Sequence, residues 1–215
     1  DYMFTVRQTV ANNGGRDVNL APYGNLARHA VPNDMKNFFI LHEGAIAMAD
    51  GELAEVDYDD MTDFDVDPAR RVPADTTQVT QNGWIGFTDH YWMATLIPEP
   101  GTSFRQVFAY NPTNNIYQTE AVLPTVQLPA GQSADVTTQL FAGAKEWETI
   151  REYERTQGID RFLDSIDWGW FFFLTKPIFA VLHFINVFIG NMGWSIIVLT
   201  LAIKAILLPL AYKSY

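Results

Sequence analysis

Apolar residues follow two different patterns along the 215 residues of this chain. Up to about residue 143 they form short runs, rich in β-branched and aromatic residues, that recur between turn signals. No strong helical period interrupts these runs, so they are typical of antiparallel β-strands. The predicted strands are 2–10, 38–41, 84–88, 91–97, 103–110, 121–128 and 134–141.

Turn-forming residues separate the predicted strands. Residues 12–15 read Asn-Asn-Gly-Gly and predict a hairpin, because Asn and Gly tolerate the positive φ of tight turns. Residues 129–131 read Pro-Ala-Gly and separate the last two strands. Regular spacing of this kind favours a sandwich over a mixed fold, so we expect residues 1–143 to be a mainly β, sandwich-like soluble domain.

The period changes after residue 143. Trp147, Ile150 and Tyr153 recur at helical spacing among charged residues, and Gly158 follows as a helix-ending residue. We therefore predict that residues 144–167 form a helical connection that contains one short amphipathic helix.

The last apolar stretch predicts a transmembrane helix at residues 191–212. It has about 20 residues, the length that crosses about 30 Å of hydrocarbon. Its aliphatic residues together favour insertion by roughly 3 to 6 kcal/mol, against about 2.5 to 3.5 kcal/mol lost at Lys204. Trp194 and Tyr212 flank the stretch and would lie at the two membrane interfaces.

Lys204 is the residue of this span that points to a function. A charge near mid-depth is costly and marks a polar cavity or an intramembrane partner. Thr200 lies one turn earlier on the same face, which Ile197 and Leu208 continue. Its hydroxyl either adds polarity to that face or bonds back to the carbonyl of Ile196. The alternative for Lys204 is a snorkelling lysine on a buried core helix.

Residues 168–190 form a second apolar region. Pro177 interrupts it and leaves about 13 residues, too few to span a bilayer. We predict an amphipathic helix in the membrane interface, with Trp168, Trp170, Phe171 and Phe172 embedded beside the headgroups. Two alternatives remain: a core helix of the β domain, and a hairpin of two spanning helices joined by residues 190–193.

Charge separates the two parts of the chain. All 25 acidic residues precede Phe171, as do 11 of the 14 lysines and arginines, which leaves −14 on the first part and +3 on the rest. The acidic part is expected to lie outside the bilayer and not to bind nucleic acid directly. There is no cysteine, and the chain begins without an initiator methionine or signal peptide, which suggests an internal fragment.

Other chemical sites have little support. Asp63, Asp65 and Asp67 have the spacing of a calcium loop, but Pro68 replaces its glycine and Ala74 its closing glutamate. A solvated acidic loop is the favoured interpretation. The histidines lack the spacing of metal ligands, and no nucleophile elbow, P-loop or dinucleotide fingerprint occurs. We expect no metal, no cofactor and no enzymatic activity.

Several short motifs carry a family resemblance. They read WIGF at 84–87, YWMATLIP at 91–98, LFAG at 140–143, DWGW at 167–170, PIF at 177–179, GNMGWSII at 190–197, TLAIK at 200–204 and PL at 209–210. In order and spacing the last five resemble the YidC/Oxa-type membrane protein insertases. The first three resemble the large periplasmic domain of the Gram-negative bacterial members.

The resemblance implies a layout in the bacterial inner membrane. Residues 1–143 would be a periplasmic β-super-sandwich, 168–190 the interfacial helix, 191–212 the first core transmembrane helix and 213–215 the start of a cytoplasmic region. Lys204 would lie in a hydrophilic groove, where family members usually carry arginine, so the charge is kept and the bidentate fork is lost.

The resemblance also implies a function and partners. The protein would insert and fold inner-membrane proteins, alone or with the Sec translocon. Its partners would be nascent membrane proteins, the Sec translocon and its SecDF subunits, the lipid bilayer, and the ribosome through cytoplasmic parts. The alternative is a membrane-anchored docking or glycan-binding module, with Trp84, Tyr91 and Trp92 as a stacking platform.

Overall fold

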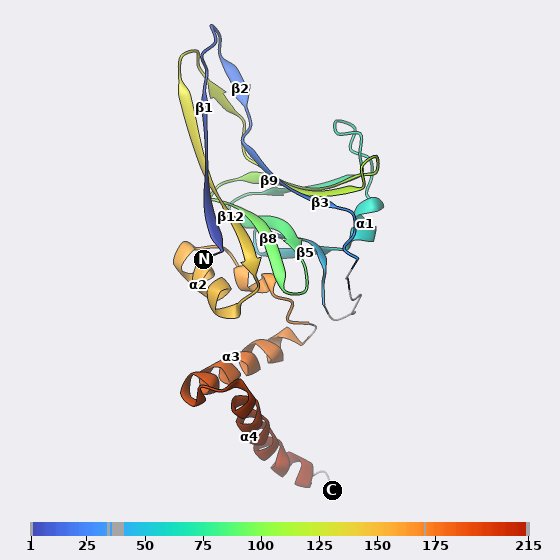
Figure 1. Ribbon diagram of the computed structural model, residues 1–215, viewed down its shortest axis with the longest axis vertical. Helices are drawn as coiled ribbons and strands as arrows, with labels where there is room; N and C mark the ends of the chain where they lie inside the picture. Colours follow the sequence, from blue (N-terminus) through green and yellow to red (C-terminus); the bar gives the residue numbers. More distant parts are fainter. Residues whose placement is uncertain (1, 34, 36–40, 170, 214–215) are drawn as a thin grey trace. The chain divides into compact units, whose positions relative to one another are not determined.

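The computed structural model describes residues 2–33, 35, 41–169 and 171–213 (Figure 1). It divides into two compact units, Asp1–Asp167 and Trp168–Tyr215. Two sequence predictions lie outside the described residues: Trp170, and all but the last residue of the strand expected at 38–41.

Twelve antiparallel strands form three sheets within the described part of the first unit (Figure 1). The largest sheet has the order β1 (Met3–Ala11), β12 (Ser133–Ala144), β8 (Trp92–Pro98), β7 (Gly83–Thr88), β4 (Gly44–Ala49) and β5 (Glu52–Val56). The second sheet has the order β3 (Tyr23–His29), β10 (Ile116–Val122), β9 (Phe104–Asn111) and β6 (Ala74–Val79). The short strands β2 (Val18–Leu20) and β11 (Val126–Leu128) pair with each other.

The core between the two larger sheets confirms the predicted sandwich. Ala45 and Phe87 from the six-stranded sheet pack with Phe104, Phe108 and Tyr117 from the four-stranded sheet, and all five are buried. Apolar side chains from facing sheets interdigitate in this way in β-sandwiches.

A second core covers the other face of the six-stranded sheet. Phe141 of β12 and Trp84 of β7 pack there with Ile150 of α2 (Trp147–Gln157) and Phe162 of the 3₁₀ helix η1 (Phe162–Ser165). As predicted, α2 ends at Gly158, whose φ of 68° is the left-handed cap that glycine adopts without strain.

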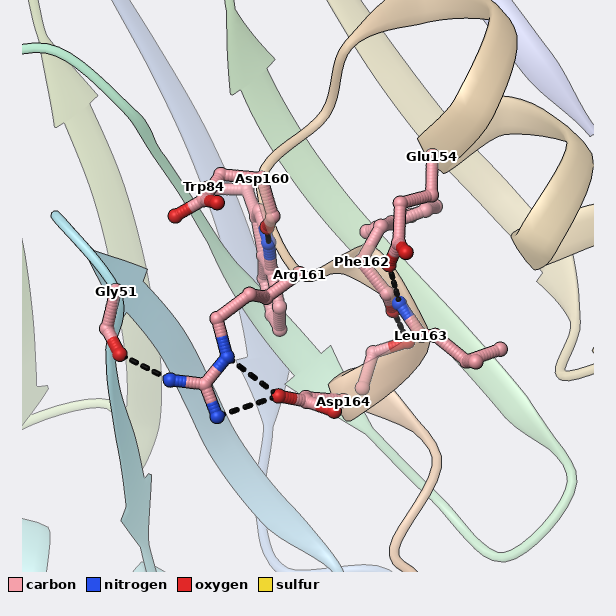
Figure 2. A network of polar contacts seen from close by, with 9 residues as sticks. Gly51, Trp84, Glu154, Asp160, Arg161, Phe162, Leu163 and Asp164 are labelled. Carbon is pink, nitrogen blue, oxygen red and sulfur yellow. Dashed lines mark hydrogen bonds and ion pairs between the residues drawn. The ribbon is translucent and has the colours of Figure 1, made fainter. Parts of the chain in front are cut away.

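Polar contacts fix η1 against the sheet (Figure 2). The indole Nε1 of Trp84 donates to the carbonyl of Asp160 at 3.0 Å. The guanidinium of Arg161 donates to the Asp164 carboxylate and to the Gly51 carbonyl, which lies in the turn between β4 and β5. These contacts attach the segment around η1, near the end of the first unit, to the six-stranded sheet.

The structure corrects two predictions in the β region. Residues 12–15 form a turn but no hairpin, because β1 pairs with β12 while β2 pairs with β11. The side-chain amide of Asn12 stabilises this pairing, because it donates to the carbonyl of Leu128 at 3.0 Å. This bond joins the turn that follows β1 to the end of β11. The strand predicted at 121–128 is two strands, β10 and β11, with Pro124 in the break.

The second unit consists of α3 (Phe172–Ile189) and α4 (Met192–Lys213). The predicted interruption at Pro177 is wrong, because α3 includes Pro177 and is continuous over its 18 residues. Pro177 lies in the second turn, where it removes a single backbone donor. The hydroxyl of Thr175 adds hydrogen bonds to the carbonyls of Trp168 and Phe171 at this end of the helix.

By length and composition, α3 and α4 could each cross a membrane. The apolar stretches Phe172–Ile189 of α3 and Met192–Pro209 of α4 have mean hydropathies of 1.8 and 1.9. The length argument against a spanning α3 therefore no longer holds, and its position in the interface stays a prediction. For α4 the observed bounds agree closely with the predicted transmembrane helix.

Candidate functional site

The start of α4 is fixed by a compact junction. Gly190 ends α3 with a φ of 70°, and its N–H donates to the carbonyl of Asn186 at 2.8 Å. The side chain of Asn191 then accepts a hydrogen bond from the Trp194 N–H, which caps the first turn of α4. The Ser195 hydroxyl donates to the Asn191 carbonyl at 2.8 Å.

One stripe of α4 is covered. Ser195 is fully buried, and Leu199 and Ile203 are half-buried at intervals of four residues. The helix in contact with α4 is α3, so this stripe is the face turned toward α3.

The opposite face of α4 carries the four predicted groove residues. Ile197, Thr200, Lys204 and Leu208 are all exposed. At 3.6 residues per turn, Lys204 is about 180° from Ser195 and about 140° from Leu199 around the helix axis. The helix therefore collects one cation, one hydroxyl and two apolar side chains on a face that α3 does not cover.

Thr200 adopts one of its two predicted arrangements. Its hydroxyl donates to the carbonyl of Ile196 at 2.7 Å, the back-bonding common for threonine in apolar helices. This bond uses the hydroxyl proton, so the oxygen faces outward as an acceptor. Thr200 can therefore accept a hydrogen bond one turn from Lys204, but its proton is already in use.

The predicted interface aromatics are exposed or lie beside a cation. Trp194 and Tyr212 are exposed near opposite ends of α4 and are about 27 Å apart along its axis at 1.5 Å per residue. Phe171 and Phe172 are exposed at the start of α3. The ammonium of Lys176 lies 5.9 Å from the Trp168 ring centroid, a cation–π contact that suits an interface.

A polar cluster in the first unit was not predicted. The Asp167 carboxylate accepts a hydrogen bond from the His42 N–H at 2.9 Å, and His42 Nδ1 lies 3.2 Å from an oxygen of Asp57. Nearby, Lys145 donates to the Thr88 hydroxyl at 2.9 Å, and burial lowers the pKa of its ammonium. The cluster fixes Asp167, the last residue before the second unit. No local sequence pattern predicts it, because its members are far apart in the chain.

The acidic loop and the histidines form no metal site in the described part of the chain. The carboxylate of Asp67 accepts hydrogen bonds from the N–H groups of Ala69 and Arg70, so it closes a turn of the acidic loop. Among the described residues no group of three histidines or carboxylates could hold a metal ion. The stacking platform is wrong as predicted, because Trp84 is fully buried in the second core, although Tyr91 and Trp92 are exposed.

Comparison with known proteins gives one family throughout. Residues 1–181 match the family model of the YidC periplasmic domain. The whole chain is 64% identical to the membrane protein insertase YidC of Ruegeria sp. (strain TM1040) and covers 35% of that protein. It is 63% identical to the protein of that name from Roseobacter denitrificans and 61% to that from Dinoroseobacter shibae, and again covers 35% of each.

These relatives are longer than the chain, which spans about a third of their length. The family match nevertheless includes the whole β-rich unit and the first half of α3. The chain therefore belongs to the YidC family, and it carries the periplasmic domain of an inner-membrane protein followed by two helices long enough to span that membrane.

Proposed function

We propose that the full-length protein is a membrane protein insertase in which α4 forms one wall of a hydrophilic groove and Lys204 supplies its positive charge. The observation that carries this proposal is the gathering of Lys204, Thr200, Ile197 and Leu208 on the exposed face of α4. The relatives named as insertases add support, since they match the chain over its whole length.

The physical task is to lower a desolvation barrier. A nascent segment with polar or acidic flanks cannot cross 30 Å of hydrocarbon unaided, because each unpaired polar group costs several kcal/mol there. A groove that admits water to mid-depth shortens this barrier. No covalent bond is made or broken, so we propose that the protein is not an enzyme.

Lys204 would act by transient electrostatic attraction. Its ammonium attracts carboxylates on the incoming tail, holds them at mid-depth and releases them as the apolar segment moves sideways into lipid. Lysine is a compact point charge, whereas arginine offers a planar fork for bidentate pairing. This mechanism therefore rests on charge and needs no paired hydrogen bonds. Ile197 and Leu208 give the substrate an apolar surface on either side of the charge.

The partners follow from this task. We propose nascent membrane proteins as substrates, the lipid bilayer as surroundings, and cooperation with the Sec translocon and its SecDF subunits in insertion and folding. The ribosome would be contacted through cytoplasmic parts of the longer protein. In this arrangement α3 lies along the periplasmic interface, α4 crosses the bilayer, and residues 213–215 begin the cytoplasmic side.

Site-specific photocrosslinking tests the groove. The probe is placed in the full-length protein at Thr200, Lys204 or Leu208, and at Leu199 or Ile206 near the α3-facing stripe as matched controls. Crosslinking is triggered while a membrane protein with a short acidic tail is being synthesised. Crosslinks to the nascent chain from the first set alone would support the groove. Equal crosslinking from both sets, or none, would overturn it and leave α4 as an anchor.

A further inference from the structure

Two adjacent aromatic side chains are exposed at the β7–β8 hairpin, Tyr91 at the end of the turn and Trp92 at the start of β8. Tyr91 is 65% exposed and Trp92 is 60% exposed. The Asp89 N–H donates to the Trp92 carbonyl at 2.8 Å and closes the turn, so the two rings are carried by ordered backbone. Single exposed apolar residues are common on proteins, but two neighbouring large aromatic residues at the end of a hairpin indicate an interaction surface.

This turn lies beside the point where the chain leaves the first unit. The Tyr91 carbonyl accepts a hydrogen bond from the Lys145 N–H at 2.8 Å. The side chain of Lys145 reaches Thr88, and the charge of Asp167 acts on its ammonium. Asp167 is in turn held by the His42 N–H. The aromatic turn and the last residue before the membrane segment therefore share one end of the six-stranded sheet.

The carboxylate of the turn itself is paired, although Glu43, Glu55 and Asp167 also lie close enough to act on Lys145. The first part of the chain carries a net charge of −14, which would keep most of its surface away from anionic headgroups. At this turn, however, the Asp89 carboxylate pairs with the Arg28 guanidinium at 2.8 Å. A turn whose carboxylate is already paired can approach a headgroup layer with less repulsion than a bare acidic loop.

We propose that Tyr91 and Trp92 form an aromatic foot that rests in the interfacial layer of the phospholipid bilayer and holds the periplasmic domain against it. Each ring has an apolar body and one polar group, the phenol O–H or the indole N–H. Such side chains favour the boundary between headgroups and acyl chains. The bilayer is the partner because the chain enters the membrane segment at Trp168, directly after the residue that shares this end of the sheet.

Fluorescence quenching in vesicles tests the foot. The full-length protein is reconstituted in phosphatidylethanolamine and phosphatidylglycerol without any other protein. An environment-sensitive fluorophore is attached at Tyr91→Cys, and in the control at Tyr23→Cys, in a background free of other cysteines. Tyr23 is a matched control because it is also 60% exposed, yet it lies five residues from Arg28 along β3, about 17 Å at 3.3 Å per residue.

The expected result is a blue shift and quenching by lipids with a nitroxide near the headgroup for the label at 91, and neither for the label at 23. No quenching at 91, or equal quenching at both positions, would overturn the proposal. Quenching that requires added Sec subunits would also overturn it, because the partner would then be a protein.

A second variant tests the contribution of Trp92. Trp92→Ala is combined with the label at 91, and the thermal unfolding midpoint is measured to verify that the domain is folded. Quenching should fall because half of the foot is gone. Unchanged quenching in a folded Trp92→Ala protein would remove Trp92 from the foot.

Discussion

The guanidinium of Arg70 holds the carboxylate of Glu120 through two parallel hydrogen bonds, Nη1 to Oε1 at 2.8 Å and Nη2 to Oε2 at 2.7 Å. Glu120 is a nearly buried residue of β10, and Arg70 belongs to the loop between α1 (Tyr58–Thr62) and β6. The pair ties the acidic loop to the four-stranded sheet, and charge-assisted bidentate bonds of this kind are among the stronger ones in proteins.

Arg70→Ala should destabilise the domain because it leaves the Glu120 carboxylate buried without its cation. We expect the free energy of unfolding to fall by about 2 to 3 kcal/mol, and by less for Arg70→Lys, which keeps the charge but not the fork. Urea titration of the chain in detergent, followed by tryptophan fluorescence, measures the change. Arg7→Ala is the control, since the Arg7–Asp135 pair is exposed and should matter little. Equal effects of the two alanine variants would contradict this.

Tyr58→Phe should stabilise the domain. The Tyr58 ring packs against Tyr117 and Phe87, while its buried hydroxyl has no hydrogen-bond partner among the described residues. Burial raises the pKa of this phenol to about 12, so the hydroxyl is neutral at any physiological pH. Removing an unpaired buried hydroxyl should add about 1 kcal/mol to the free energy of unfolding. Tyr58→Ala is the companion variant, with an expected loss of about 3 to 5 kcal/mol. A destabilised phenylalanine variant would show that the hydroxyl does bond.

Gly86→Ala should disrupt the six-stranded sheet. A Cβ at Gly86 would lie 1.9 Å from the carbonyl oxygen of Ala94 and 2.7 Å from the Cα of Thr95 on β8. Backbone atoms cannot swing aside as a side chain can, so β7 and β8 must separate. We expect a loss of about 3 kcal/mol in the urea titration. Gly15→Ala serves as the control, because nothing lies within 4 Å of its added Cβ. A sheet that accepts both substitutions equally would refute the close approach at Gly86.

Asp50 should make the domain sensitive to acid. Its carboxylate accepts hydrogen bonds from the N–H and hydroxyl of Thr80 and from the N–H groups of Gln81 and Asn82. These bonds, those from Thr80 most of all, hold the pKa of Asp50 well below the ordinary 3.8. Because the folded pKa is the lower one, this stabilisation is fully present above the ordinary value and is lost as the pH falls below it. Asp50→Asn should lower the unfolding midpoint at pH 7 and flatten its decline between pH 4 and pH 2. A parallel decline in both proteins would exclude Asp50 as a source.

If α4 lines a groove as proposed, Lys204→Glu should abolish insertion of substrates with acidic tails, because a negative charge at this position repels them. Lys204→Arg keeps the charge and should retain activity. The measurement is insertion of such a substrate in cells that depend on the full-length variant, with Ile206→Ala, close to the α3-facing stripe, as the control. Insertion by the glutamate variant at the level of the unaltered protein would refute the electrostatic role.

Much of the β unit could be predicted from local sequence, and the misses have physical causes. Strands such as β8 and β9 are predictable from sequence because they are rich in β-branched and aromatic residues. β4 reads GAIAMA, whose alanines favour no strand by themselves, and its pairing with β5 and β7 decides the conformation. β3 contains a glycine and several polar residues on an exposed edge, so its pattern is weak.

The candidate site divides in the same way. Helical spacing alone places Lys204, Thr200 and Leu208 on one face of α4, since the period of the helix fixes that face. Which face α3 covers depends on tertiary packing, as does the continuation of α3 through Pro177. The contact between His42 and Asp167 joins residues 125 positions apart and leaves no trace in the local pattern.

The hydrogen bond between His42 and Asp167 also affects how a force applied to the following residue is transmitted into the domain. Tension pulling outward on Trp168 loads this bond before it can unwind η1, and passes from His42 into β4. That strand lies inside the six-stranded sheet, between β7 and β5. A strand that is hydrogen-bonded on both sides leaves the sheet only when both sets of bonds break, whereas an edge strand leaves when one set breaks. The attachment at Asp167 therefore couples a pull on Trp168 to a strand that is held by two neighbours.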